Sequence, residues 1–253
     1  MKKLFLLFAL SCALLVLYFS DQTTVEQKIV QPSIHVAQVK PNQPTQSVQK
    51  PETYYGIDLS HYQGDLLQNI GRHNNLHFII AKATQGERYV DPEFHYNWRE
   101  IKKHGLIRGA YHFYVTSVPP QSQVEHFYDV VGDLQKSELP PVVDIESGSL
   151  KGKITPAKLQ ADLIEFLKGA EQKFGRPPMI YTSYDFAQEY LKNPVFNQYP
   201  LWLAEYTQAA QPKIPETWGK AGYRIWQKAD SHDINSTETD FDEFTGLQSD
   251  LVK

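Results

Sequence analysis

The chain has 253 residues, of which 41% are hydrophobic and 21% charged, and its formal net charge at pH 7 is −4. This composition is typical of a folded protein with a substantial core, and the length suits one large domain or two small ones. It excludes wholesale disorder. The acidic balance also argues against nucleic acid as a partner, because a phosphate backbone attracts basic surfaces.

The first twenty residues have the pattern of an export segment. Lys2 and Lys3 precede an uncharged, mostly apolar run at residues 4–19, as in the charged and apolar regions of a signal peptide. No clean small-x-small cleavage site follows Phe19, and the run is slightly short for a membrane span. A lipoprotein signal at Cys12 is a weaker match. We expect residues 1–20 to be an export signal or an N-terminal membrane anchor, with the retained anchor preferred.

Residues 21–51 contain seven Gln and four Pro and show no sustained helical or strand period, which predicts a disordered, solvated tether. The folded domain is expected at residues 52–253, with 20 basic and 27 acidic residues. Cys12 is the only cysteine and precedes this domain. Disulfides, thiol nucleophiles and thiolate metal sites are therefore excluded from it. The protein is therefore expected to be exported, periplasmic or extracellular, with contact to the membrane only through residues 4–19.

Short apolar runs rich in Val, Ile, Tyr and Trp recur along the domain and predict strands. They are "YYGIDLS", "HFIIAKA", "IRGAYHFY", "PPVVDIE", "PMIYTSY", "PLWLAEY" and "YRIWQKA". Amphipathic helices are predicted at residues 92–104, 121–134 and 156–174, and the later strands follow one another closely. This alternation predicts an α/β fold, an irregular TIM-like barrel whose last units have lost their helices. A doubly wound open sheet is the alternative, although no glycine-rich phosphate loop is present.

Carboxylates stand where two of the predicted strands end. Asp58 ends the first run, and Asp144 and Glu146 end "PPVVDIE". Residues at i and i+2 of a strand share a face, roughly 6 to 7 Å apart along the backbone. Their repulsion tends to keep one of them protonated, which gives the acid and base of glycosidic bond cleavage. A turn or cap role is the usual explanation for an isolated Asp. The alternative is a metal site with His61 or His112, although no ligand spacing supports it.

The motifs together resemble the glycoside hydrolase family 25 muramidases, also called Chalaropsis-type or phage-type lysozymes. The resemblance rests on eight motifs in the family's order: "GIDLSHYQG", "FIIAKATQG", "GLIRGAYHFY", "PPVVDIE", "PMIYTSY", "PLWLAEY", "YRIWQ" and "TDFDEF". It implies a barrel of five β/α units followed by closely connected strands. It also implies hydrolysis of the β-1,4 bond between N-acetylmuramic acid and N-acetylglucosamine in peptidoglycan, with no metal or cofactor.

The same resemblance implies roles for four carboxylates. Glu146 corresponds to the acid that protonates the leaving oxygen, and Asp144 to its partner. Asp58 and Asp240 correspond to aspartates of the first-strand and C-terminal motifs. Whether Asp144 acts as nucleophile, as base or by orienting the substrate N-acetyl group stays open.

This chain departs from the family pattern at two places. Gln85 stands where relatives often have Glu, and Asp242 replaces the usual Asn with Glu243 beside it. The first change puts a possible substrate contact in doubt. The second is expected to make the rim of the cleft more acidic.

Aromatic and polar side chains at strand ends suit a sugar cleft, because sugar rings stack on aromatic faces and hydroxyl groups need fixed hydrogen-bond partners. The predicted substrate-binding residues are Gln63, Lys82, Tyr111, Tyr181, Trp202, Trp226 and Gln227. Core packing is the alternative for both tryptophans, and a counter-ion role is the alternative for Lys82. His112 is expected to be structural.

Peptidoglycan glycan strands are the expected partner of a monomeric enzyme. A module that binds glycan without cutting it and an enzyme acting on another N-acetylated polysaccharide are the competing hypotheses.

Overall fold

A computed structural model describes residues 50–70 and 75–253, so the predictions made for residues 1–49 lie outside the described residues. The strands are β1 (Glu52–Leu59), β2 (Leu76–Gln85), β3 (Tyr89–Val90), β4 (Ile107–Phe113), β5 (Val142–Asp144), β6 (Met179–Ser183), β7 (Leu201–Ala204), β8 (Ile225–Ile234) and β9 (Thr237–Gly246). The α-helices are α1 (Leu66–Asn69), α2 (Phe94–Lys103), α3 (Pro120–Val131), α4 (Pro156–Phe174), α5 (Tyr184–Tyr190) and α6 (Gln248–Leu251). No helix in this part of the chain is both long and apolar enough to cross a membrane.

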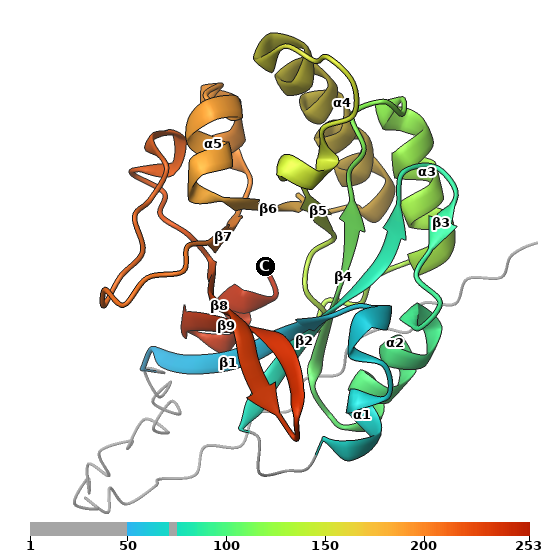
Figure 1. The fold of residues 1–253 in the computed structure, drawn as a ribbon, viewed down its shortest axis with the longest axis vertical. Helices are drawn as coiled ribbons and strands as arrows, with labels where there is room; N and C mark the ends of the chain where they lie inside the picture. Colours follow the sequence, from blue (N-terminus) through green and yellow to red (C-terminus); the bar gives the residue numbers. More distant parts are fainter. Residues whose placement is uncertain (1–49, 71–74) are drawn as a thin grey trace, which may run out of the picture. The chain divides into compact units, whose positions relative to one another are not determined.

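The strands form a closed barrel, which confirms the predicted fold class (Figure 1). The order around the barrel is β1-β9-β8-β7-β6-β5-β4-β2, and pairing between β1 and β2 closes the ring. Within the ring, β1, β2 and the strands from β4 to β8 pair in parallel, whereas β9 is antiparallel to both neighbours. The short β3 pairs only with β2 and stands outside the ring. Closure leaves the barrel with no free sheet edge and gives it two distinct ends.

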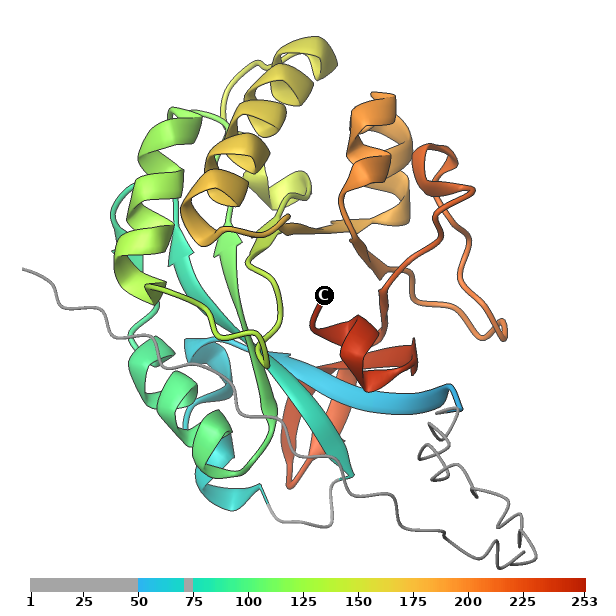
Figure 2. The same cartoon turned by 180° about the vertical axis from the view of Figure 1, so that it is seen from behind.

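Five β/α units precede the strands that lack α-helices. The helices α1, α2, α3, α4 and α5 follow successive strands of the ring, and in the described chain no α-helix separates β7, β8 and β9. Figures 1 and 2 show the long helices around the outside of the strands. The hairpin formed by β8 and β9 completes the ring. Strand β9 was not among the predicted apolar runs because its residues, "TETDFDEFTG", are mostly polar.

Helix α4 illustrates how sequence signals set the elements. It begins at Pro156, after Thr155 caps it by accepting a hydrogen bond from the backbone N–H of Lys158. It ends where Gly175 adopts a left-handed conformation with φ of 70°. Its buried stripe packs on the outer face of the sheet. The bounds are those that the sequence predicts.

The sheet has an apolar cluster on each face. The outer cluster lies between strands and helices and includes Ile57, Val143 and Leu203. The inner cluster fills one end of the barrel with Phe78, Ile80, Leu139, Val142, Met179, Trp202, Ile225, Phe244 and Leu251. Gly56 is required here, because a Cβ at this position would lie 2.3 Å from the ring of Phe78. The inner cluster closes one end of the barrel and leaves the other for polar residues.

Candidate active site

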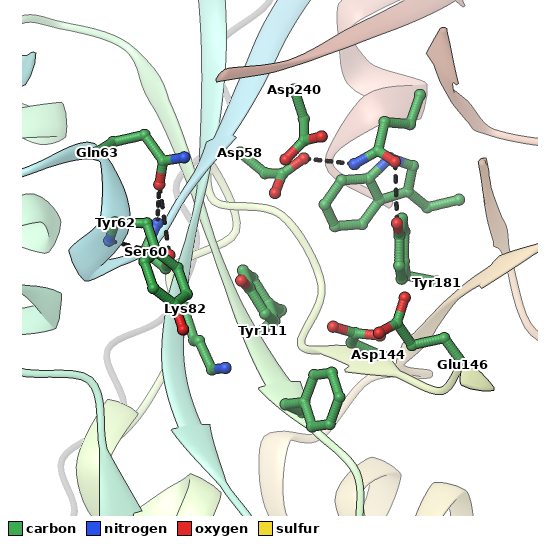
Figure 3. Close-up of a pocket in the computed structure, with 13 residues that line it drawn as sticks. Asp58, Ser60, Tyr62, Gln63, Lys82, Tyr111, Asp144, Glu146, Tyr181 and Asp240 are labelled. Atoms are coloured by element: carbon green, nitrogen blue, oxygen red, sulfur yellow. Dashed lines mark hydrogen bonds between the residues drawn. The ribbon is translucent and has the colours of Figure 1, made fainter. Parts of the chain in front are cut away.

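A cavity of about 220 Å³ opens at the carboxyl ends of the parallel strands, above the inner apolar cluster. Figure 3 shows that side chains from several strands converge on it. The lining residues are Asp58, Ser60, Tyr62, Gln63, Lys82, Tyr111, Phe113, Asp144, Glu146, Tyr181, Trp202, Gln227 and Asp240. The four predicted carboxylates therefore meet in one cavity, together with every predicted binding residue except Trp226.

Asp144 and Glu146 reach the cavity because the chain stays extended past the end of β5. Asp144 is the last residue of β5, and Glu146 has φ of −150° and ψ of −175°. Ile145 between them is buried in the outer cluster, as alternation requires. The backbone N–H of Glu146 donates to Ser149 Oγ at 3.1 Å. Gly148 leaves room for the carboxyl group, since a Cβ there would lie 2.9 Å from Glu146 Oε1.

Burial and charge shift the titration of this pair. Burial and the neighbouring Glu146 hold the pKa of Asp144 well above its usual range, and burial raises the pKa of Glu146 as well. Lys82 opposes both shifts, and burial in turn lowers its own pKa. Asp144 is only 7% exposed, and its Oδ1 accepts no hydrogen bond within the described residues. One proton on the pair removes its internal repulsion and leaves one negative charge near Lys82.

Lys82 is held by uncharged neighbours. Its ammonium donates to Gln85 Oε1 at 2.9 Å and lies 4.8 Å from the ring centre of Phe113. A neutral acceptor orients the ammonium without cancelling its charge. The lysine therefore remains available to offset Asp144 and Glu146.

A second acidic group lies across the cavity on β1 and β9. Gln227 Nε2 donates to Asp58 Oδ2 at 2.7 Å, and Figure 3 shows Asp240 beside Asp58. Burial and the charges of Asp240 and Asp242 hold the pKa of Asp58 well above its usual range, and burial raises the pKa of Asp240. Both shifts favour the protonated forms, because burying several like charges together is costly.

The expectation that Asp242 adds charge to the rim was wrong. Asp242 is 0% exposed, and its Oδ1 accepts a hydrogen bond from the indole N–H of Trp202 at 2.7 Å. It lies two residues beyond Asp240 on β9, so it shares the inward face one step deeper in the barrel. Glu243 points outward and pairs with Lys228 at 2.9 Å. Strand alternation separates the two acidic residues onto opposite faces.

Aromatic side chains form one wall of the cavity. The rings of Tyr181 and Trp202 meet edge to face with their centres 4.5 Å apart. The Tyr181 hydroxyl donates to Gln227 Oε1 at 2.9 Å. Tyr111 lies between the two acidic groups, as Figure 3 shows. Two carboxylate groups, fixed hydrogen-bond donors and aromatic faces in one cavity suit a polysaccharide substrate.

Comparison with known proteins assigns the family. A family model described as glycosyl hydrolases family 25 matches residues 57–237. The chain belongs to glycosyl hydrolase family 25. It is therefore a glycoside hydrolase by descent, as the motifs predicted.

Relatives of this family 25 chain include uncharacterised and named proteins. It is 34% identical over 206 residues to the uncharacterized protein YegX of Escherichia coli strain K12, covering 79% of this chain and 72% of YegX. It is 27% identical over 207 residues to lysozyme M1 of Streptomyces globisporus, covering 78% and 69%. Among solved structures, a muramidase from Trichobolus zukalii superimposes with a TM-score of 0.69 at 31% identity, covering 79% of this chain and 97% of that one.

Trp226 lies outside the family 25 cavity. It neighbours Gln227 on β8, so it points to the opposite face of the sheet. The indole N–H donates to the backbone oxygen of Glu205 at 2.8 Å, and Lys228 Nζ lies 4.5 Å from the ring centre. It is 1% exposed. The prediction named both residues of this alternating pair, and only Gln227 lines the cavity, whereas Trp226 has the packing role that was its alternative.

The two histidines considered as metal ligands make protein contacts instead. His112 is buried, with Nδ1 2.8 Å from Thr84 Oγ1 and Nε2 3.1 Å from Gln123 Oε1, and burial lowers its pKa to about 3. His61 Nδ1 lies 2.8 Å from Asp91 Oδ2. Within residues 50–70 and 75–253, no group of three or more His, Cys, Asp or Glu side chains has the arrangement of a metal site.

Several cavity residues were missed from the sequence. Ser60 accepts from the N–H of Tyr62 and begins a short 3-10 helix, which brings Tyr62 and Gln63 to the rim. Phe113 follows Tyr111 by two residues and shares its face. The alternation rule applied to "GAYHFY" would have found Phe113. Ser60 had a detectable signal too, since Ser followed by Gln three residues later is a capping pattern.

Proposed function

We propose that the protein is an N-acetylmuramidase that hydrolyses the β-1,4 bond between N-acetylmuramic acid and N-acetylglucosamine in peptidoglycan. The observation that carries this proposal is the convergence of Asp144 and Glu146, with raised pKa values, in a cavity lined by tyrosines and a tryptophan. Family membership and relatives named lysozyme and muramidase support the choice of substrate.

Glu146 is the proposed general acid. Its raised pKa favours the protonated form, which can donate its proton to the oxygen of the leaving sugar. Burial keeps the pKa of Asp144 raised, but once Glu146 holds the proton its repulsion no longer adds to this shift, and Lys82 favours the charged form of Asp144. A charged Asp144 stabilises the positive charge that develops on the sugar ring in the transition state.

Three mechanisms give Asp144 different roles, and the anomeric configuration of the product separates one of them from the other two. Direct attack by the carboxylate and attack by the substrate's own N-acetyl oxygen both retain the anomeric configuration. Base-catalysed attack by water inverts it. NMR of the first product formed from a soluble glycan fragment therefore separates the third role from the other two.

Product analysis on defined peptidoglycan tests the activity itself. The purified protein is expected to solubilise peptidoglycan and to generate reducing N-acetylmuramic acid ends, identified by mass spectrometry after borohydride reduction. Intact strands, or reducing ends that are only N-acetylglucosamine, would contradict the proposal. Release of fragments from another N-acetylated polysaccharide alone would favour that competing substrate.

The site of action follows from the substrate. We propose an enzyme exported to the bacterial envelope, where residues 1–20 direct export and residues 21–51 tether the domain. Fractionation of cells producing the full chain, compared with the chain lacking residues 2–20, tests this. Protein found with the membrane only when the segment is present supports a retained anchor, whereas a released form starting beyond residue 20 supports cleavage.

A further inference from the structure

Tyr206 is an exposed aromatic residue beside the cavity that the sequence did not single out. It lies two residues beyond the end of β7, and it is 52% exposed. Among the described residues, only Tyr62, Tyr89 and Tyr206 are large hydrophobic side chains with high exposure. An exposed ring next to a sugar-binding cavity calls for an explanation, because burial would normally be favoured for so large an apolar surface.

The Tyr206 side chain is fixed through its hydroxyl group. Its hydroxyl donates to Gln227 Oε1 at 2.7 Å, and Gln227 is 2% exposed at the wall of the cavity. The same oxygen accepts from Tyr181 at 2.9 Å. With two hydroxyl donors on its oxygen, the amide must direct its Nε2 toward Asp58, to which it donates at 2.7 Å. Tyr206 therefore helps to orient a group that contacts the site.

The backbone before Tyr206 is also anchored. The N–H of Glu205 donates to the backbone oxygen of Gln227 at 3.2 Å, and the oxygen of Glu205 accepts from the indole of Trp226. Both ends of the tyrosine, backbone and hydroxyl, are thus tied to β8, while the ring stays open to solvent. A ring held in this way loses little conformational entropy when a ligand stacks on it.

We propose that Tyr206 is a substrate-binding and positioning residue, whose ring stacks on a sugar of the glycan strand beyond the bond that is cut. Its hydroxyl, acting through Gln227, keeps the amide directed at Asp58. The inference rests on the proposed function for the identity of the ligand. The Tyr206 ring would add a binding position outside the cavity, so its loss should affect the binding of long strands more than that of short fragments.

Three variants separate the ring from the hydroxyl. Tyr206→Ala removes both, Tyr206→Phe removes only the hydroxyl, and Tyr223→Phe is the matched control. Tyr223 lies on the same connection, and its hydroxyl donates to Gln211 Oε1 at 2.6 Å away from the cavity residues. The full-length protein is assayed on long glycan strands and on the shortest fragment that it cleaves, together with its thermal midpoint.

Tyr206→Ala is expected to raise KM for long strands about tenfold, the loss typical of one stacking contact, and to change KM for the shortest fragment less than twofold. Tyr206→Phe is expected to keep KM for long strands and to lower kcat several-fold on both substrates. Tyr223→Phe should change neither. Equal losses on both substrates for Tyr206→Ala with a lowered midpoint would reduce the residue to a structural role, and unchanged kinetics would overturn the inference outright.

Binding measurements keep this inference separate from the proposed function. Glu146→Gln and the double variant Glu146→Gln, Tyr206→Ala are compared for their affinity for long, soluble peptidoglycan strands. A tenfold weaker Kd in the double variant supports the binding role of Tyr206 even if the wild-type protein cuts nothing. Equal affinities would remove that role even if the muramidase activity is demonstrated.

Discussion

The two halves of the barrel interior are built from the same strands, but the inward side chains are apolar in one half and mostly polar in the other. In the closed half, inward positions carry apolar side chains such as Val142 and Met179. Two residues further along the same strands, the inward positions are Asp144 and Tyr181. One step of strand alternation, about 6.6 Å, therefore separates core from active site.

The comparison shows how stability and chemistry are divided within one sheet. The closed half gains free energy by removing apolar surface from water. The open half buries several carboxyl groups whose pKa values are raised, so it costs stability near neutral pH. Substitutions in the two halves are expected to have opposite effects on folding and on turnover.

The largest expected effect belongs to the open half. Glu146→Gln keeps the size of the side chain but cannot donate the catalytic proton, so kcat should fall about 10³-fold, or ~4 kcal/mol in activation free energy. The variant should still bind glycan strands. Steady-state kinetics and a binding assay check both. Unchanged turnover would remove Glu146 from the acid role, and loss of glycan binding together with turnover would assign it to substrate binding.

A core substitution in the closed half should do the reverse. Phe78→Ala removes a fully buried ring and should lower the free energy of unfolding by about 3–5 kcal/mol, measured by denaturant titration. Activity per folded molecule should persist. Gly56→Ala supplies the control, because its Cβ clashes with the Phe78 ring in the wild type and fills the space in Phe78→Ala. Gly56→Ala should therefore destabilise the wild-type protein but stabilise the Phe78→Ala variant. If the losses of unfolding free energy from the two substitutions simply add, this packing is contradicted.

Asp242→Asn should stabilise the protein, in contrast to Phe78→Ala in the closed half. The raised pKa of Asp242 means that the folded state keeps a proton that the unfolded chain releases above about pH 4, so wild-type stability falls as pH rises from there toward the folded pKa. The asparagine avoids this cost and can still accept from Trp202. We expect the free energy of unfolding to increase by about 1–3 kcal/mol at neutral pH and to change little at pH 4.

Unfolding measured across pH checks the Asp242 prediction. The matched control is Asp65→Asn, since Asp65 is exposed and its side chain makes no capping hydrogen bond. A stability gain that is the same at pH 4 and pH 7 would mean that Asp242 is not the titrating group.

The smallest effect should come from Lys82→Met. Lys82 lowers the pKa values of Asp144 and Glu146, so its loss should raise both. The whole profile of kcat/KM against pH should therefore shift to higher pH. At neutral pH the expected loss is about tenfold, or ~1.4 kcal/mol. Lys103→Met, at an exposed pair with Glu100, is the control. A uniform loss without a shift along the pH axis would assign Lys82 to substrate binding alone.

Much of the fold could be predicted from the sequence because its signals are local. Apolar runs and the alternation of strands with helices indicated the barrel, and the resemblance to the family implied its five β/α units. Strand β9 escaped because it is polar, and its place in the ring depends on pairing with β1, far away in the chain. Such pairing leaves no mark in a short window of sequence.

The candidate site divides in the same way. The sequence alone determined which carboxylates are present at strand ends, since Asp58, Asp144 and Glu146 each interrupt or end an apolar run. Only the tertiary structure decided which neighbours face inward and how deeply. It buried Asp242 beneath the cavity, turned Trp226 away from it and placed Tyr206 over Gln227. The reason is that barrel closure fixes the face of every strand at once, and that constraint comes from contacts between distant segments rather than from local sequence.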